Sequence, residues 1–281
     1  YVSYKRVRAC YIPSCIYAIL MKLDCIEKGQ GETVLLLHST AAGNKQWRKL
    51  IEILSSNYHV IAPNLYGYGA TSAWSKPHPQ KLADHVSLLE RVFVDEPKIN
   101  IIGHSFGGSV AMMAAKIHKP KINKLILIEP NPFYLLSNNQ ESDGYKEAVA
   151  LCDVIKRNGD KGTWSIAAKY FADYWNGNGN WESMDKERQD KLISALKPNY
   201  HEWDCVMKET VSIEEWAHSL PTNTTILMSE DTVQSIKDIN SLFQSKIPGW
   251  SYMNYGDGGH MAPLTHAHII NPLIERVLES K

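Results

Sequence analysis

The pattern Gly-x-Ser-x-Gly occurs at residues 103–107 and has Ser105 at its centre. An apolar run typical of a buried strand precedes it at 99–102, and an Ala- and Met-rich segment with helical spacing follows it. A serine at a sharp strand-to-helix turn holds a strained backbone conformation, which requires small neighbours such as Gly103 and Gly107. The free N–H groups of the helix N-terminus favour developing negative charge there. This context predicts that Ser105 is a nucleophile and disfavours an ordinary N-cap serine.

Several histidines are candidates for the base that a nucleophilic serine needs. His260 lies in a glycine-rich loop between a predicted strand and the last predicted helix, a position from which its ring reaches over the serine. His266 and His268 have a spacing that suggests a metal site, but residues two apart on a helix point in different directions. His38 and His104 occupy strand ends, where structural hydrogen bonds explain them better. We therefore predict that His260 is the base, and we expect no metal and no cofactor.

An oxyanion formed next to Ser105 needs N–H donors. One donor is the backbone N–H of Phe106, which directly follows the nucleophile. The second comes from the loop after an earlier strand. The apolar run 34–37 is followed by such a loop of small residues, which are Ser39, Thr40, Ala41, Ala42 and Gly43.

Short apolar runs bounded by turn residues indicate buried strands, and segments with helical spacing lie between most of them. This alternation predicts an α/β fold with a mostly parallel sheet and helices on both faces. From 134 to about 219, however, the pattern is helical and rich in Trp and Tyr. We therefore predict a helical cap at 133–218 inserted into a core made of 21–132 and 219–281, with a continuous core carrying extra helices as the alternative. The runs are 34–37, 59–62, 99–102, 125–128 and 225–228 for strands, and 47–54, 82–94 and 110–117 for helices.

The composition gives no indication of nucleic-acid binding, and the cysteine pattern favours a reducing compartment. The 281 residues carry 30 basic and 30 acidic side chains, and the resulting zero net charge gives no reason to expect nucleic acid as a partner. The five cysteines are scattered and form no Cys-x-x-Cys, which favours a reduced, cytoplasmic setting. A homodimer is left open.

Residues 1–20 combine a basic front with a short apolar run that Pro13 interrupts. A helix that spans a bilayer needs about 20 apolar residues, so we expect no stable membrane insertion. The run weakly resembles a signal peptide but lacks a small-residue cleavage site. We interpret 1–20 as an N-terminal extension and Met21 as the functional start, because residues 21–39 have the pattern of an opening hairpin.

Four motifs together resemble the α/β-hydrolase superfamily: LLLHSTAAG, NLYGYGATS, GHSFGG and GGHMAP. The resemblance covers 21–130 and 220–281, and it implies a sheet of about eight strands, a lid inserted after the sixth, and ester-like substrates. It also implies that Thr40 carries the second oxyanion N–H, although Ser39 replaces the usual glycine. Asn64 replaces the usual acid of the tyrosine-rich loop, a change expected to affect only local hydrogen bonds.

The acid that orients the histidine has two candidates. Most of the superfamily places it after the seventh strand in a Gly-x-x-Asp pattern, but that position holds Thr232 here, and Asp231 lies one residue early. A subset that resembles haloalkane dehalogenases places it at the tip of the sixth strand, where Glu129 lies directly before Pro130. Burying a carboxylate there is costly unless a partner such as His260 compensates. We predict Glu129, with Asp231 as the alternative and a solvated strand end as the remaining explanation.

These residues predict a serine hydrolase that cleaves small carboxylic esters through an acyl-enzyme on Ser105. His260 is its base, and Phe106 and Thr40 are its oxyanion donors. Dehalogenation is disfavoured because it needs a carboxylate nucleophile. The alternatives are a carbon–carbon bond hydrolase or a perhydrolase with the same triad, and a slow-turnover ligand receptor on this fold.

Overall fold

The computed structural model describes residues 22–280, so the interpretation of 1–20 and Met21 lies outside the described residues. Seven strands in the described range form one sheet in the order β1-β3-β2-β4-β5-β6-β7. All neighbours are parallel except β1 and β3, which confirms the predicted α/β fold with a mostly parallel sheet. The resemblance implied roughly one strand more. The strands are β1 (Cys25–Lys28), β2 (Glu32–Leu37), β3 (Tyr58–Pro63), β4 (Ile99–His104), β5 (Ile122–Ile128), β6 (Thr224–Ser229) and β7 (Ser251–Tyr255).

The central strands form where the sequence has continuous apolar runs, because helices cover both faces of the sheet and leave no wet side. β4 and β6 are buried at every residue, and β2 at every residue but the first. Each of the five predicted strand runs lies within one of these strands.

The expected opening hairpin is wrong, because β3 lies between β1 and β2 in the sheet. Gly29 and Gly31, in the turn after β1, have φ values of 85° and 119°. A Cβ at Gly29 would lie 2.2 Å from the carbonyl oxygen of Tyr58, the first residue of β3. The turn therefore packs tightly on the segment that enters β3, and this strand pairs with β1 on one side and β2 on the other.

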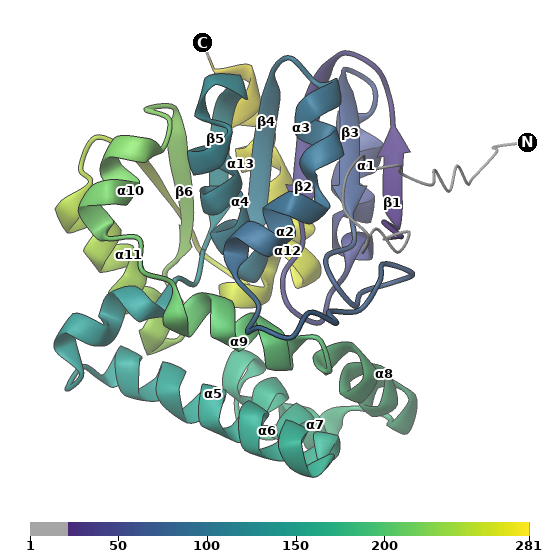
Figure 1. The fold of residues 1–281 in the computed structure, drawn as a ribbon, viewed down its shortest axis with the longest axis vertical. Coiled ribbons are helices and arrows are strands. Elements are labelled where there is room, and N and C mark those ends of the chain that lie inside the picture. The colour runs from purple at the N-terminus through teal and green to yellow at the C-terminus, as the bar shows by residue number, and fades with distance from the viewer. Residues whose placement is uncertain (1–21, 281) are drawn as a thin grey trace, which may run out of the picture.

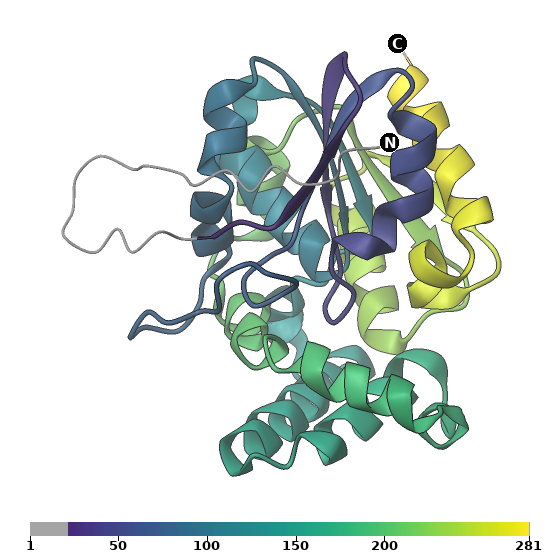
Figure 2. The same cartoon turned by 90° about the vertical axis from the view of Figure 1, so that its right-hand side faces the viewer.

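Helices cover the two faces of the sheet, as the edge-on view in Figure 2 shows. α1 and α13 pack together on one face, whereas α2 and α10 contact α4 on the other. The segments predicted at 47–54 and 110–117 are helical, whereas the one predicted at 82–94 is divided at Leu89 into two helices, α2 and α3. The bounds are η1 (Asn44–Trp47), α1 (Arg48–Leu54), α2 (Leu82–Leu88), α3 (Glu90–Asp95), α4 (Phe106–Ile117), η2 (Lys119–Lys121), α10 (Ile213–Ser219), α11 (Gln234–Lys246), η4 (Gly259–Met261), α12 (Ala262–Thr265) and α13 (Ala267–Glu279).

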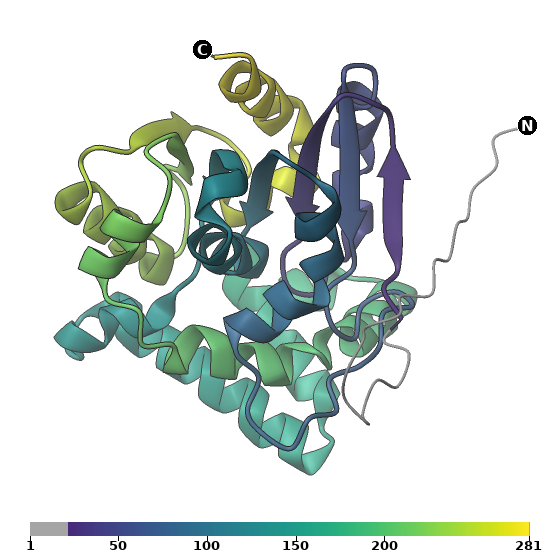
Figure 3. The same ribbon diagram turned by 45° about the horizontal axis from the view of Figure 1, so that its top comes forward.

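The chain between β5 and β6 contains helices but no strand. Figures 1 and 3 show most of these helices gathered together on one side of the sheet, beyond the ends where β4 and β5 lead out of it. The arrangement agrees with the proposed cap, whose exact limits stay a prediction. Besides α10, which contacts α4 and α11 of the core, these helices are η3 (Phe133–Asn139), α5 (Asp143–Lys161), α6 (Trp164–Asn176), α7 (Asn180–Ser183), α8 (Lys186–Leu196) and α9 (Asn199–Lys208).

Within residues 22–280, every helix is too short or too polar to cross a membrane.

Candidate active site

Ser105 lies at the sharp turn between β4 and α4, which is the strand–turn–helix arrangement predicted from its motif. Its φ and ψ are 54° and −119°, a conformation that residues with a side chain rarely adopt. Two neighbours must be glycine. A Cβ at Gly103 would lie 2.4 Å from the Gly107 oxygen, and one at Gly107 would lie 2.3 Å from the Leu37 oxygen. The close packing of the flanking backbone therefore holds the serine in its strained position.

His260 connects Ser105 with Glu129. Its Nε2 lies 3.0 Å from the Ser105 hydroxyl, and its Nδ1 lies 2.7 Å from Glu129 Oε2. A carboxylate accepts hydrogen bonds, so the network assigns the ring proton to Nδ1 and leaves Nε2 to accept the serine proton. All three side chains are buried. The structure thus brings together the three residues predicted as nucleophile, base and acid.

Glu129 is not a solvated strand end, because its side chain is completely buried. The residue directly follows β5 and has a φ of 42°. Its Oε1 accepts the Ser229 N–H at 2.8 Å, and its Oε2 accepts the Thr232 hydroxyl at 3.0 Å in addition to His260. Three donors therefore replace the water that burial removes from the carboxylate. Ser229 and Thr232 occupy the glycine and acid positions of the usual pattern.

Asp231 does not reach His260. Its side chain is exposed, and its backbone N–H donates to the Ser229 hydroxyl at 3.1 Å. The structure therefore supports Glu129 as the partner of His260.

The histidines at the strand ends hold backbone in place. His38 accepts the Leu65 N–H at Nε2 and donates from Nδ1 to the Ser39 carbonyl, and burial lowers its pKa to about 4. His104 donates from Nε2 to the backbone carbonyl of His260 at 2.8 Å. Burial lowers the pKa of His104 far below its usual value, so this ring is also neutral. These histidines position the site, as the sequence indicated.

His266 and His268 lie away from the triad contacts. His266 directly precedes α13, and its Nδ1 forms a 2.9 Å hydrogen bond with the Thr265 hydroxyl. His268 lies in the first turn of α13.

Thr40 and Phe106 line the same cavity as Ser105, which is the placement that two oxyanion donors require. Phe106 is the first residue of α4. Two hydrogen bonds at Thr40 and Ala41 hold the loop that carries Thr40. The Thr40 hydroxyl donates to Glu202 at 2.6 Å, and the Ala41 N–H donates to the Tyr68 hydroxyl at 3.1 Å.

Ser39 replaces the usual glycine, and the side-chain amide of Gln46 accepts hydrogen bonds from it. Its N–H and its hydroxyl both donate to Gln46 Oε1, at 3.1 and 2.9 Å. Gln46 Nε2 in turn donates to His104 Nδ1 at 3.1 Å. One hydrogen-bonded path therefore connects the oxyanion loop with the backbone of His260.

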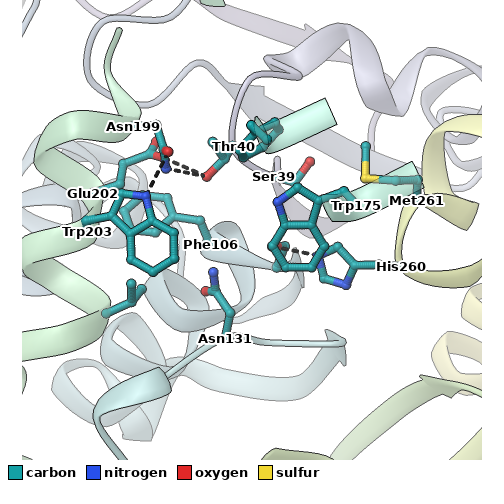
Figure 4. A pocket seen from close by; sticks show the side chains of 13 residues that line it. Ser39, Thr40, Phe106, Asn131, Trp175, Asn199, Glu202, Trp203, His260 and Met261 are labelled. Atoms are coloured by element: carbon teal, nitrogen blue, oxygen red, sulfur yellow. Dashed lines mark hydrogen bonds between the residues drawn. The ribbon is translucent and has the colours of Figure 1, made fainter. Parts of the chain in front are cut away.

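Residues of the chain between β5 and β6 close the cavity, and sequence reasoning assigned none of them a role. The indole of Trp175, from α6, stacks on the His260 ring with 4.1 Å between centroids (Figure 4). Glu202 and Trp203, from α9, line another part of the wall. The cavity measures about 20 Å³, little more than the space that one water molecule needs. In the sequence, these residues were indicated only by an acid and several Trp within an aromatic segment with helical spacing.

Known proteins resemble this chain in sequence and in structure. A family model described as alpha/beta hydrolase fold matches residues 32–148. The 2-hydroxy-6-oxo-6-(2'-aminophenyl)hexa-2,4-dienoic acid hydrolase of Metapseudomonas resinovorans is 28% identical over 131 residues, which are 44% of this chain and 44% of that protein. The serine hydrolase-like protein of Homo sapiens is 32% identical over 115 residues, which are 40% of this chain and 57% of that protein. The chain thus spans about half the length of these relatives.

A solved structure from a study of carboxylesterases of the Thaumarchaeon Nitrososphaera gargenis matches nearly the whole chain. Its TM-score is 0.71 at 16% sequence identity, over 94% of this chain and 97% of that one. At this identity the likeness shows the fold alone.

Proposed function

We propose that this chain, which a family model described as alpha/beta hydrolase fold matches over residues 32–148, hydrolyses small carboxylic esters through an acyl-enzyme on Ser105. The observation that carries the proposal is the hydrogen-bonded series from Ser105 through His260 to the buried Glu129. A serine, a base and an acid in this geometry form the arrangement that activates a hydroxyl for acyl transfer.

The first half of the reaction forms the acyl-enzyme. The Ser105 oxygen attacks the ester carbonyl while His260 Nε2 takes its proton, and Glu129 stabilises the imidazolium through Nδ1–H. The N–H groups of Phe106 and Thr40 stabilise the negative charge on the former carbonyl oxygen. The imidazolium then protonates the leaving alcohol as the carbon–oxygen bond breaks.

The second half releases the product. His260 takes a proton from a water molecule, which attacks the acyl carbon held on Ser105. The second tetrahedral intermediate collapses, the proton returns to the serine oxygen, and the carboxylic acid leaves. The same two N–H groups serve both halves because the oxyanion forms at the same atom.

The cavity favours small, uncharged or cationic esters over anionic substrates. Among the described residues that line it there is no lysine or arginine, and Glu202 contributes a carboxyl group. This lining argues against a carbon–carbon bond hydrolase for anionic acids. A perhydrolase and a slow ligand receptor use the same triad, and no lining residue favours them. The cavity is smaller than an ester, so residues around it must shift for substrate to enter. The cytoplasmic setting stays a prediction.

Two measurements test the proposal. A fluorophosphonate probe should label the protein at Ser105, because only an activated serine reacts with it. A panel of p-nitrophenyl esters of graded acyl length should show turnover with a preference for short chains. Absence of labelling together with absence of turnover on every ester would contradict a serine hydrolase and favour the receptor.

A further inference from the structure

Glu202 is a buried acid next to the catalytic residues that the proposed reaction does not use. It lies on α9, its side chain is 1% exposed, and it lines the cavity that contains Ser105. Its Oε2 accepts the Thr40 hydroxyl at 2.6 Å and the Asn199 amide at 3.1 Å. Its Oε1 is buried and has no hydrogen-bond partner within the described part of the chain. One carboxylate oxygen is therefore anchored and the other is free for a ligand.

The surroundings of Glu202 fix its orientation before any ligand binds. Trp203 donates from its indole N–H to Asn199 Oδ1 at 2.9 Å, which directs the amide nitrogen of Asn199 toward Glu202 (Figure 4). Burial raises the pKa of Glu202, whereas Thr40, Asn199 and the nearby Tyr68 hydroxyl oppose that rise by stabilising the ionised carboxylate. A ligand meets a carboxyl group that does not need to reorganise.

The protein supplies no cation to this carboxylate. Within residues 22–280, Glu202 forms no ion pair, and the only basic side chain that lines the cavity is His260. The Nδ1 of His260 is already bound to Glu129, and its Nε2 faces Ser105. A buried carboxylate without a cation is costly, and a ligand that brings a positive charge removes that cost.

Aromatic side chains line the rest of the cavity. Trp175, Trp203 and Phe106 are among them, and the faces of such rings attract cations. An acid surrounded by aromatic rings is the combination that recognises amines in their protonated form.

We propose that Glu202 is a substrate-binding residue whose Oε1 accepts the N–H of a protonated amine, so that the preferred ester carries an ammonium group close to its scissile bond. The inference rests on the proposed ester hydrolysis and adds the class of substrate.

The test compares esters that differ by one atom. 2-(Dimethylamino)ethyl butyrate is protonated near neutral pH, and 3-methylbutyl butyrate is its carbon analogue. The ratio of their kcat/KM values should favour the amine at least about tenfold in the wild-type protein. In Glu202→Gln the ratio should fall close to one, and taking the ratio within one variant cancels any general loss of turnover. The matched control is Glu187→Gln, which makes the same charge change on the exposed surface of α8 and should leave the ratio unchanged.

Three results would overturn the inference and leave ester hydrolysis standing. The first is a wild-type ratio close to one, and the second is a ratio that persists in Glu202→Gln. The third is a kcat/KM for butyrylcholine, whose quaternary nitrogen has no N–H to donate, that equals the value for 2-(dimethylamino)ethyl butyrate. A failure of the proposed function looks different, because neither ester would then react and Ser105 would not be labelled.

A binding measurement tests the role of Glu202 even when neither ester reacts. Calorimetric titration with N,N-dimethylbutylammonium should show at least about tenfold tighter binding to the wild-type protein than to Glu202→Gln. Equal affinities would overturn the role of Glu202 whether or not the protein turns over an ester.

Discussion

The two sides of the cavity differ in how completely their polar groups are hydrogen-bonded. On the sheet side, Ser105, His260 and Glu129 form a closed set of hydrogen bonds. On the opposite side, which helices between β5 and β6 form and which we call the cap side, Trp175 and Glu202 each carry a buried polar atom, Nε1 and Oε1, without a partner in the described residues. Buried polar groups are nearly always hydrogen-bonded, and the unpaired Oε1 of Glu202 is the atom with which we propose that a ligand pairs. The triad is fully hydrogen-bonded without substrate, whereas the polar groups on the cap side are not.

Removal of the proposed nucleophile, on the sheet side, should cause the largest loss of activity. Ser105→Ala should lower kcat for p-nitrophenyl esters by about 10⁴ to 10⁶-fold, because the remaining cavity keeps only binding and the oxyanion donors. Labelling by the fluorophosphonate should disappear. A variant that keeps labelling would place the reactive residue elsewhere.

Replacement of the buried acid should have the next largest effect. Glu129→Gln should lower kcat by about 10³ to 10⁴-fold, because the amide neither fixes the Nδ1–H form of His260 nor stabilises its charged form. The melting temperature shows whether the fold persists. The matched control is Asp231→Asn, which should keep near-full activity. Activity lost in the control and kept in Glu129→Gln would assign the acid to Asp231.

His85 is an exception on the sheet side and offers a test of stability. Both of its ring nitrogens are buried without partners in the described residues, between the rings of Tyr66 and Phe106. Burial lowers its pKa to about 3, so the folded protein holds the ring neutral. The unfolded chain binds this proton below about pH 6.5, and stability is therefore lost as the pH falls from there toward the folded pKa.

At pH 5 this loss amounts to about 2 kcal/mol. His85→Phe should remove it, and denaturant titrations at pH 7.5 and pH 5 measure the difference. Replacement of the exposed His78 by Gln is the control and should leave the pH dependence as it is in the wild-type protein. An unchanged dependence in His85→Phe would mean that His85 is not the acid-sensitive group.

Changes on the cap side should alter selectivity more than chemistry. Trp175→Ala removes the ring that covers His260 and enlarges the cavity, so the preference for p-nitrophenyl octanoate over acetate should rise by about tenfold. Tyr170→Ala on the outer face of the same helix is the control, since Tyr170 is exposed and does not line the cavity. If both variants kept the wild-type preference, Trp175 would not limit the acyl group.

The sheet side was predictable from sequence because its residues lie at the ends of strands. Ser105 and Glu129 each follow an apolar run, and parallel strands carry such ends to one edge of the sheet. The sequence showed that the usual acid was missing at Thr232. It did not show that this threonine and the Ser229 N–H would bind Glu129, because that contact depends on the path of a loop.

The cap side was not predictable from the same patterns. Helical spacing identifies an apolar face, but it does not say whether that face meets the sheet or another helix. Trp175 and Trp203 were therefore seen only as members of an aromatic segment, and Glu202 was not singled out. The prediction of an opening hairpin was wrong for a related reason. It assumed that β1 and β2, which are adjacent in sequence, pair with each other, whereas β3 lies between them in the sheet.

The position of the triad residues along the chain has a consequence for how the site assembles. Ser105 and Glu129 belong to one strand–helix–strand unit, β4–α4–β5, and their placement is set locally. His260 meets them from 155 and 131 residues away, and the other two donors to Glu129 come from the last residue of β6 and from the loop after it. Contacts so distant in sequence carry the larger loop-closure cost and form late. We therefore expect the unit that carries Ser105 and Glu129 to be inert by itself, and the proposed activity to arise only when the C-terminal strands join the sheet.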